Sequence, residues 1–580
     1  MADNLLDKAS ILLTPTAYND GSMLSVKPNE NLYGSELVTN GDFSNGLTNW
    51  SVNGGSYATI VDGALNSNNT ENGSWFAENV SQDVSFVSGK TYKIFFKARN
   101  ISGDSNLRIT HQSHIVFSNN LTSSFVDYTI YYTAQANNDS IRIFCNDAVG
   151  QFQIDNVSIV EDLTGDFTFS RGSAATRVNA QGLVENVQII SSELVSNGNF
   201  SQGGQDWTLG SGWSIGDGVA VVDNAPDGER LQQNNVFVSG KTYKVTYEIT
   251  EISQGGFRGY VGGTNLTTRS AVGTYTETLI APLNDVFYIR TIQTTSGSIT
   301  NISVKEITDD TDLPRIDYTD GCGSWLLEPQ STNLYLNSET LATQSNTTSA
   351  STYTVSFYGT GTITFSGTHT GTLVGTGAND RVSATFTATA GTLTSTISGT
   401  CTKGQLENLS YATSYIPTNG ATNTRLQDIA NNSGNSTLIN STEGVLYAEI
   451  AALANDGIFR IISLTDGSTS NRVSLIYNTT NNFFRIMVVS SGSTVFDISH
   501  SVTSTLDFHK VAIKYKANDF AVWIDNVEVA TDTSGATPIG LDRITFDVGN
   551  STLNFYGKAK AVAVFKEALT DAELQSLTTQ

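Results

Sequence analysis

Short stretches in which apolar and polar residues alternate recur along most of the chain. Residues 91–98 (TYKIFFKA), 127–134 (DYTIYYTA) and 140–147 (SIRIFCND) carry an apolar side chain at every second position. A period of two predicts β-strands with one buried face, and the stretches rich in Gly, Asn and Ser between them predict turns. The pattern therefore predicts an all-β protein made of antiparallel jelly-roll β-sandwich domains.

One long pattern occurs twice. Three blocks recur in the same order, at 35–50 and 192–207, at 86–98 and 237–249, and at 152–161 and 297–306. The spacing between the blocks is shorter in the second copy, as expected when loops rather than cores lose residues. We therefore expect residues 35–162 and 192–308 to be two copies of one sandwich with the same strand order.

The rest of the chain divides by composition. Residues 1–34 read as an extended N-terminal arm, and residues 163–191 as a connector between the two copies. Residues 309–437 hold a stretch of almost only Thr, Ser, Gly and β-branched residues, which predicts a third sandwich with flanking extended segments. Residues 438–580 predict a last sandwich that closes on a short helix with a capping box. An arm this short has too little core to stand alone, so we expect it to be ordered only against a neighbouring subunit or another protein.

Charge and apolar content exclude several classes of function. The 580 residues carry 31 Lys and Arg against 55 Asp and Glu, a net charge of −24, which disfavours nucleic acid and anionic lipid as partners. There is no apolar run of about 18 residues, so no membrane insertion is expected. The first residues, MADNLLDKAS, lack the apolar core of a signal peptide, which predicts synthesis in a cytoplasm without secretory export.

Catalytic signatures are missing from the sequence. We find no Ser-His-Asp order, nucleophile elbow, phosphate-binding loop or metal-ligand spacing. Residues 438–580 also lack the closely spaced carboxylates that a sandwich-type glycosidase needs. We therefore expect a protein that is not an enzyme and requires no cofactor.

The repeated blocks resemble the jelly-roll carbohydrate-binding modules, which open on a phrase like ELVxNGxF and contain a GKTYK strand. The resemblance implies the sandwich fold and, more weakly, sugar binding. It also implies a structural calcium ion in the first copy, held at Asp42 and Asp155. The residues themselves allow another interpretation, in which Asn40, Gly41 and Asp42 form only a hydrogen-bonded turn. The second copy has Thr300 at the closing position, so no calcium is expected there.

The tryptophans are the candidates for stacking on sugar rings. Trp50 and Trp207 occupy the same place in the two copies, and we expect them in the cores. Trp75 and Trp213 lie between the matched blocks and are the better candidates for exposed platforms. Trp523 is a third candidate, and the sequence leaves open which face of its strand it occupies.

Four ordered phrases outside the copies resemble bacteriophage virion proteins of the tail- or head-fibre type. They are FTFSRGSAATRVNAQGLVE (167–185), PRIDY (314–318), LLEPQSTNL (326–334) and QLENLSYATSYIPTNGATNTR (405–425). The resemblance implies a virion structural protein that residues 1–34 anchor to other virion proteins, and a homo-oligomer, with a trimer favoured. The arginines of the phrases are Arg171, Arg177, Arg315 and Arg425. We interpret them as staples that tie extended segments down, with ordinary surface arginines as the alternative.

Residues 438–580 resemble the concanavalin A-like, laminin-G type sandwich through FHKVAIKYK (508–516) and the strand after it. Three hypotheses follow. The first is a virion fibre or decoration protein whose sandwiches bind a host surface polysaccharide, which the acidic charge predicts to be neutral and bound by the C-terminal domain. The second is a structural spacer without glycan binding. The third is a glycan-degrading enzyme with accessory modules.

Overall fold

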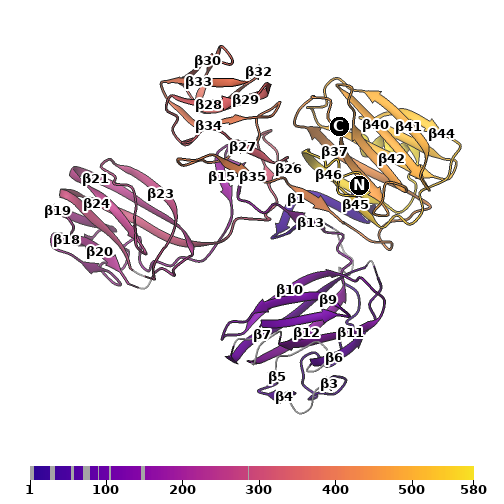
Figure 1. Cartoon of the computed structure of the whole chain (residues 1–580), viewed down its shortest axis with the longest axis horizontal. Helices are drawn as coiled ribbons and strands as arrows, with labels where there is room; N and C mark the ends of the chain where they lie inside the picture. The colour runs from indigo at the N-terminus through magenta and orange to yellow at the C-terminus, as the bar shows by residue number, and fades with distance from the viewer. Residues whose placement is uncertain are drawn as a thin grey trace. The chain divides into compact units, whose positions relative to one another are not determined.

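The computed structural model describes residues 5–26, 33–53, 58–69, 79–88, 90–103, 106–145, 150–234, 236–284 and 286–579. Nearly all regular structure within them is antiparallel β, which confirms the all-β class (Figure 1). The chain divides into two compact units. The first unit is Met1–Phe169, Gly323–Glu328 and Ile429–Gln580, and the second is Ser170–Cys322 and Pro329–Asp428. No helix in the described part of the chain is long and apolar enough to cross a membrane.

The first repeat is a sandwich of two sheets. One sheet has the order β3 (Ser51–Asn53), β6 (Asn79–Val84), β11 (Asp139–Cys145), β8 (Asn106–His111) and β9 (His114–Asn120). The other has the order β10 (Val126–Thr133), β7 (Thr91–Gly103), β12 (Gly150–Glu161), β5 (Ala64–Asn69) and β4 (Ala58–Val61). Apolar side chains from the inner faces of both sheets form one core between them, as the alternation predicts.

The second repeat has the same strand order, but two of its strands are long enough to serve both sheets. These are β21 (Thr242–Val261) and β24 (Phe287–Asp309), which pair with each other through several register shifts. The front sheet runs β17 (Thr208–Leu209), β20 (Arg230–Gln233), residues 287–292 of β24, residues 256–261 of β21, and β22 (Thr264–Asn265). The back sheet runs β18 (Trp213–Gly216), β19 (Val219–Ala225), the rest of β24, the rest of β21, and β23 (Gly273–Ile280), with β16 (Ile189–Ile190) added along β24.

The repeated opening phrase forms the same local structure in both copies. The Trp50 indole N–H donates to the Asn40 carbonyl and the Trp207 indole N–H to the Asn197 carbonyl, each at 3.0 Å. The Asn40 side-chain amide donates to two carbonyls of its own loop, and so does the Asn197 amide. Trp50 and Trp207 are both buried, as expected for core residues. The shared contacts and strand order confirm that the two copies have one fold.

The N-terminal segment is part of the C-terminal sandwich. β1 (Ile11–Asn19) pairs with β46 (Gly557–Phe565), and the side chains of Ile11 and Leu13 are fully buried. The expectation that this segment is ordered only against a neighbour is therefore wrong for the described residues 5–26. Its apolar side chains complete a sheet of the same chain, so no second protein is needed to cover them.

The C-terminal sandwich has two sheets. The larger sheet runs β36 (Ile429–Asn431), β13 (Phe167–Ser170), β2 (Ser22–Ser25), β1, β46, β37 (Glu443–Ala452), β42 (His509–Lys516), β43 (Phe520–Ile524) and β44 (Val527–Asp532), and β26 (Ser324–Leu327) also pairs with β46. The other sheet runs β41 (Ser493–Ser501), β40 (Phe483–Ser490), β39 (Arg472–Tyr477), β38 (Arg460–Thr465) and β45 (Arg543–Thr545). The short helices η1 (Leu5–Lys8) and α1 (Asp571–Thr578) contact each other, and α1 packs on β42 and β43. Thr570 and Glu573 form the predicted capping box of α1.

The Thr-, Ser- and Gly-rich stretch forms a small sandwich in the second unit. One sheet runs β28 (Gln344–Thr348), β33 (Gly391–Ser398), β30 (Thr362–Gly367) and β31 (Gly371–Val374). The other runs β32 (Gly377–Ala388), β29 (Ser351–Gly359) and β34 (Cys401–Glu407). Two short ladders lie beside it in the chain, β14 (Ala175–Val178) with β15 (Val184–Val187) and β27 (Ser331–Asn333) with β35 (Asn423–Arg425), and β25 (Ile316–Asp317) follows the second repeat.

Three of the four phrase arginines are buried staples. Asp428 accepts a hydrogen bond from Arg171 at 3.0 Å and another from Arg315, and all three side chains are fully buried. Arg315 also donates to the hydroxyl of Ser414 at 2.6 Å, and Arg425 donates to the carbonyl of Pro329 at 2.6 Å. Burial lowers the pKa of Arg171, and the charge of Asp428 opposes that shift. The staple interpretation is therefore confirmed for Arg171, Arg315 and Arg425.

The fourth arginine lies nearer the surface. Arg177 pairs with Glu185 at 2.9 Å across the β14–β15 ladder, and both side chains are partly exposed. Arg177 therefore fits the alternative interpretation, that of an ordinary surface arginine, better than the three buried arginines do.

Candidate glycan-binding face

The outer face of the front sheet in the second repeat carries tyrosine and arginine side chains. Residues directly opposite one another in antiparallel strands point to the same side, so the pairing register places them in two adjacent rows. The first row is Thr208, Gln232, Tyr288, Tyr260 and Asn265, and the second is Arg230, Arg290 and Arg258. We call these eight residues the tyrosine–arginine face.

The alternation of the strands places this face away from the core. The residues that alternate with the two rows along the strands point inward, and Leu231, Ile289 and Phe287 are fully buried in the core of the repeat. Arg230, Thr208 and Asn265 are exposed, whereas Tyr260, Arg258, Arg290 and Gln232 are half-buried. The face is therefore a surface from which side chains of both rows remain accessible.

The two tyrosines stack on each other at the centre of the first row. Their ring centroids are 4.4 Å apart and their planes differ by 5°. The guanidinium of Arg230 lies 4.2 Å from the ring centroid of Tyr288, so Tyr288 is held between Arg230 and Tyr260 and is only 6% exposed. Stacking and cation–π attraction both favour the sequence Arg230, Tyr288, Tyr260, so these contacts hold the two rings in place. Tyr260 is the more accessible ring of the pair.

The three arginines of the second row stand side by side on neighbouring strands. Arg290 pairs with Arg230 on one side and with Arg258 on the other. Arg258 donates its Nε hydrogen to the hydroxyl of Thr268 at 2.7 Å, whereas the Nε of Arg290 is buried without a hydrogen-bond partner. Neighbouring guanidinium groups repel each other, so this row concentrates positive charge.

Two other cations of this repeat have carboxylate partners. Arg269 pairs with Glu277 at 3.3 Å and Lys241 with Glu306 at 2.8 Å. Among the described residues, no carboxylate forms an ion pair with an arginine of the second row. The row is therefore unusual in a chain with 55 acidic and only 31 basic residues.

The first repeat does not carry these side chains on its equivalent face. Asn79 stands where Arg230 does, seven residues before the matched phenylalanine, and Phe144 pairs with Arg108 as Arg290 pairs with Arg258. The other row holds Ser81, Arg142 and Thr110 in place of Gln232, Tyr288 and Tyr260. One fold thus presents two different surfaces, and only the second repeat has the paired tyrosines and the row of arginines.

Two of the three tryptophans proposed as sugar platforms are buried. Trp213 is 7% exposed and packs at a tilt against Phe257 inside the core of the second repeat. Trp523 is 8% exposed and packs in the cluster that includes Leu574 and Leu577 of α1. The expectation of an exposed platform is wrong for Trp213, and Trp523, whose face the sequence left open, is also buried in a core. Trp75 lies outside the described residues.

The two carboxylates proposed for calcium are engaged in local hydrogen bonds. Asp42 accepts from the backbone N–H and the hydroxyl of Ser44 at 3.2 and 2.9 Å, and these bonds lower its pKa. Asp155 accepts from the N–H of Asn156 at 2.7 Å. Within the described residues, no group of three or more His, Cys, Asp or Glu side chains is placed to hold a metal ion. These contacts match the hydrogen-bonded turn, and the donor set does not fit a calcium ion held by clustered carboxylates. Calcium binding itself stays a prediction.

Sequence reasoning missed the tyrosine–arginine face, although part of the signal was present. Arg258 and Tyr260 are two positions apart in the segment GFRGYV (256–261), and Tyr288 and Arg290 have the same spacing on the neighbouring strand. The period of two places each pair on one face of its strand. Aligning the two copies at these outward positions would have shown the difference.

Comparison with known proteins gives low-level structural likenesses. No protein-family model matches the chain, and no curated protein matches it. A carbohydrate-binding module of the CBM4 class is 20% identical, with 21% of this chain and 99% of that chain covered and a TM-score of 0.19. The tandem CBM22 domains of Xyn10C from Paenibacillus barcinonensis are 11% identical, with 48% and 99% covered and a TM-score of 0.19.

A third solved structure of this kind is domain 4 of the arabinanase AbnA from Geobacillus stearothermophilus, in complex with arabinotriose. It is 13% identical, with 29% of this chain and 81% of that chain covered and a TM-score of 0.22. At TM-scores this low the likenesses carry no conclusion about what this chain does.

Proposed function

We propose that this protein binds glycans through the tyrosine–arginine face of its second repeat. The observation that carries the proposal is the ordered stack of Arg230, Tyr288 and Tyr260 on an accessible sheet face. Binding sites combine aromatic surface with a few polar groups that fix orientation, and here Gln232 and Asn265 flank the tyrosines in the same row. A sugar ring offers apolar C–H groups to a tyrosine ring and hydroxyls to the amides.

The proposal is one of binding without catalysis. Glycosidases place two carboxylates across the bond that they break. None of the eight residues of the tyrosine–arginine face is Asp or Glu. The residues of the face suit recognition of a sugar chain and offer no acid–base pair.

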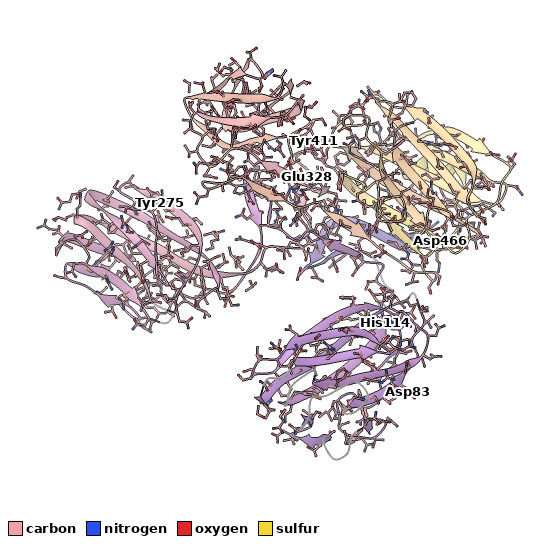
Figure 2. All side chains as sticks on the ribbon, viewed as in Figure 1. Asp83, His114, Tyr275, Glu328, Tyr411 and Asp466 are labelled. Atoms are coloured by element: carbon pink, nitrogen blue, oxygen red, sulfur yellow. The ribbon has the colours of Figure 1, made fainter. Side chains whose placement is uncertain are left out.

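The proposed test is a glycan array probed with the full chain and with Tyr260→Ala. We expect the chain to bind at least one class of glycan, and the variant to lose most of that binding. Tyr275→Ala is the matched control, because Tyr275 lies on β23 in the back sheet of the same repeat (Figure 2). Absence of binding to every glycan, or equal loss in both variants, would contradict the proposal.

We further propose that the glycan-binding chain is a component of a bacteriophage particle and is present there in several copies. The support is the resemblance of the four phrases to virion fibre proteins. Several copies would strengthen weak individual contacts by avidity. Immunogold labelling of purified particles with antibody against residues 438–580 tests this, and particles that stay unlabelled would contradict it.

A structural role without glycan binding is the second candidate. The buried contacts of Arg171 and Arg315 with Asp428 favour it, because they hold segments that are distant in the sequence together. If the full chain binds no glycan but is found on particles, this candidate replaces the first.

A further inference from the structure

We propose that the tyrosine–arginine face selects an acidic polysaccharide, one whose sugars carry carboxylates. This inference rests on the proposed glycan binding and names the class of glycan. It also departs from the neutral polysaccharide that the net charge of the whole chain suggests, because local charge rather than net charge meets the ligand.

The row of arginines is the first reason. Three arginines occupy directly opposite positions on neighbouring strands, and none is in an ion pair with a described carboxylate. Keeping like charges together is unfavourable unless an anion is bound, since each guanidinium raises the energy of the next. The partner that such a row fits best is one that brings several negative charges.

The geometry of the groups is the second reason. A guanidinium offers two parallel N–H groups, which match the two oxygens of a carboxylate. The central arginine, Arg290, is half-buried, and its Nε has no partner within the protein. Half-burial leaves part of this guanidinium accessible, so a ligand carboxylate can accept hydrogen bonds from it.

The position of the tyrosines beside the arginines is the third reason. The two rows are adjacent, so a sugar ring over Tyr260 places a carboxylate on its edge near Arg258 or Arg290. Neighbouring strands are about 4.8 Å apart, which is comparable with the length of one pyranose ring. Successive acidic sugars running across the strands could therefore face successive arginines. Phosphate and sulfate groups are tetrahedral and do not offer a planar pair of oxygens at the edge of the sugar ring. We therefore propose a carboxylated polysaccharide.

The test compares charged and uncharged forms of the same polymers. The probes are polygalacturonate, alginate and hyaluronan, each beside its fully methyl-esterified form, with dextran sulfate as a general polyanion. Binding of the full chain is measured by biolayer interferometry. We expect at least one of the three carboxylated polymers to bind, and its methyl ester to bind at least about tenfold more weakly, since a hydrogen bond to a charged group is lost with each charge.

Variants locate the effect. Arg290→Gln and Arg258→Gln should each weaken binding of the acidic polymer by about ten- to a hundredfold. Arg108→Gln, at the position of the first repeat that corresponds to Arg258, changes the net charge equally and should leave binding unchanged. Thermal melting of each variant shows whether it is folded, and Arg290→Lys tests whether the fork, rather than charge alone, is needed.

The outcomes separate this inference from the proposed function. Binding of a neutral glycan that Tyr260→Ala abolishes and Arg290→Gln leaves intact would overturn the acidic class and keep glycan binding. Equal binding of dextran sulfate and of the carboxylated polymers would show simple attraction of polyanions and would also overturn it. If none of the acidic polymers binds and the glycan array shows no binding, both this inference and the proposed glycan binding are overturned.

Discussion

Arg171 and Asp428 form an ion pair at 3.0 Å with neither side chain accessible to solvent, although 257 residues separate them in the chain. Arg315 meets the other oxygen of the same carboxylate. Asp428 therefore neutralises two buried cations that come from two separate phrases of the sequence. The phrases that resemble virion proteins thus contribute a structural centre, whereas the candidate binding residues lie in the second repeat.

Removal of the shared carboxylate should destabilise the second unit strongly. Asp428→Asn leaves Arg171 and Arg315 buried without a counter-charge, and breaking a buried pair in this way costs about 3–5 kcal/mol. Denaturant unfolding of the full chain measures the loss. Glu185→Gln is the control, because its pair with Arg177 is partly exposed and is worth about 0–1 kcal/mol. Equal stability of the two variants would show that Asp428 does not hold the centre together.

The N-terminal strand should contribute to the stability of the C-terminal sandwich. Ile11 is fully buried and lies opposite Val564 in the β1–β46 ladder. Ile11→Ala should lower the free energy of unfolding by about 2–5 kcal/mol through lost burial and the cavity left behind. Thr16→Ala, at an exposed position of the same strand, should change it by less than about 0.5 kcal/mol. An Ile11→Ala protein that melts like the parent chain would restore the idea of an independent arm.

Gly198 should be intolerant of any side chain. A Cβ there would lie 1.9 Å from the carbonyl oxygen of Ile302, whose own N–H donates to the Gly198 carbonyl at 2.9 Å. Gly198→Ala should therefore force this contact apart and cost about 1–3 kcal/mol. Gly204→Ala is the matched control in the same loop, since its Cβ would meet only the Cδ1 of Ile215 at 4.0 Å. Differential scanning calorimetry distinguishes them, and similar melting temperatures would contradict the close approach.

The C-terminal sandwich should lose stability as the pH rises from mildly acidic to mildly basic. Burial alone would lower the pKa of His509, but hydrogen bonds to Asp525 at 2.5 Å and to Ser504, with the charge of Asp525, raise it above 6.5. A raised pKa means that the folded state binds the proton more tightly than the unfolded state. The contribution is therefore fully present below about pH 6.5 and lost as the pH rises through the folded pKa.

Urea unfolding at a series of pH values from about 5 to about 9, on both sides of the usual histidine pKa, measures this effect. His509→Gln should flatten the fall in stability with rising pH. His500→Gln, on β41 of the other sheet, should retain it. A parent chain whose stability stays level over this range would show that folding does not raise the pKa of His509.

Local patterns in the sequence were sufficient to predict the strands and the repeat, and to point to the arginines of the phrases. Alternation with a period of two reports which residues of a strand share a face, and this depends only on neighbours in the chain. The repeated phrase predicts one fold twice because Trp50 and Trp207 make the same contacts within ten residues of sequence. The scarcity of positive charge in the chain singled out Arg171, Arg177, Arg315 and Arg425, of which the structure buries all but Arg177.

Only the tertiary structure decided which faces and partners these strands have. Arg230, Tyr260 and Tyr288 lie on three strands whose order is set by sheet topology, so their stack is absent from any one stretch of sequence. The apolar residues of β1 predict a strand, yet their partner in β46 is about 550 residues away. The local sequence allows Trp213 and Trp523 to lie on either face of a strand. Both are buried because close packing of the cores requires their side chains. Pairing and burial are long-range consequences of packing the whole chain, whereas strand formation is a local one.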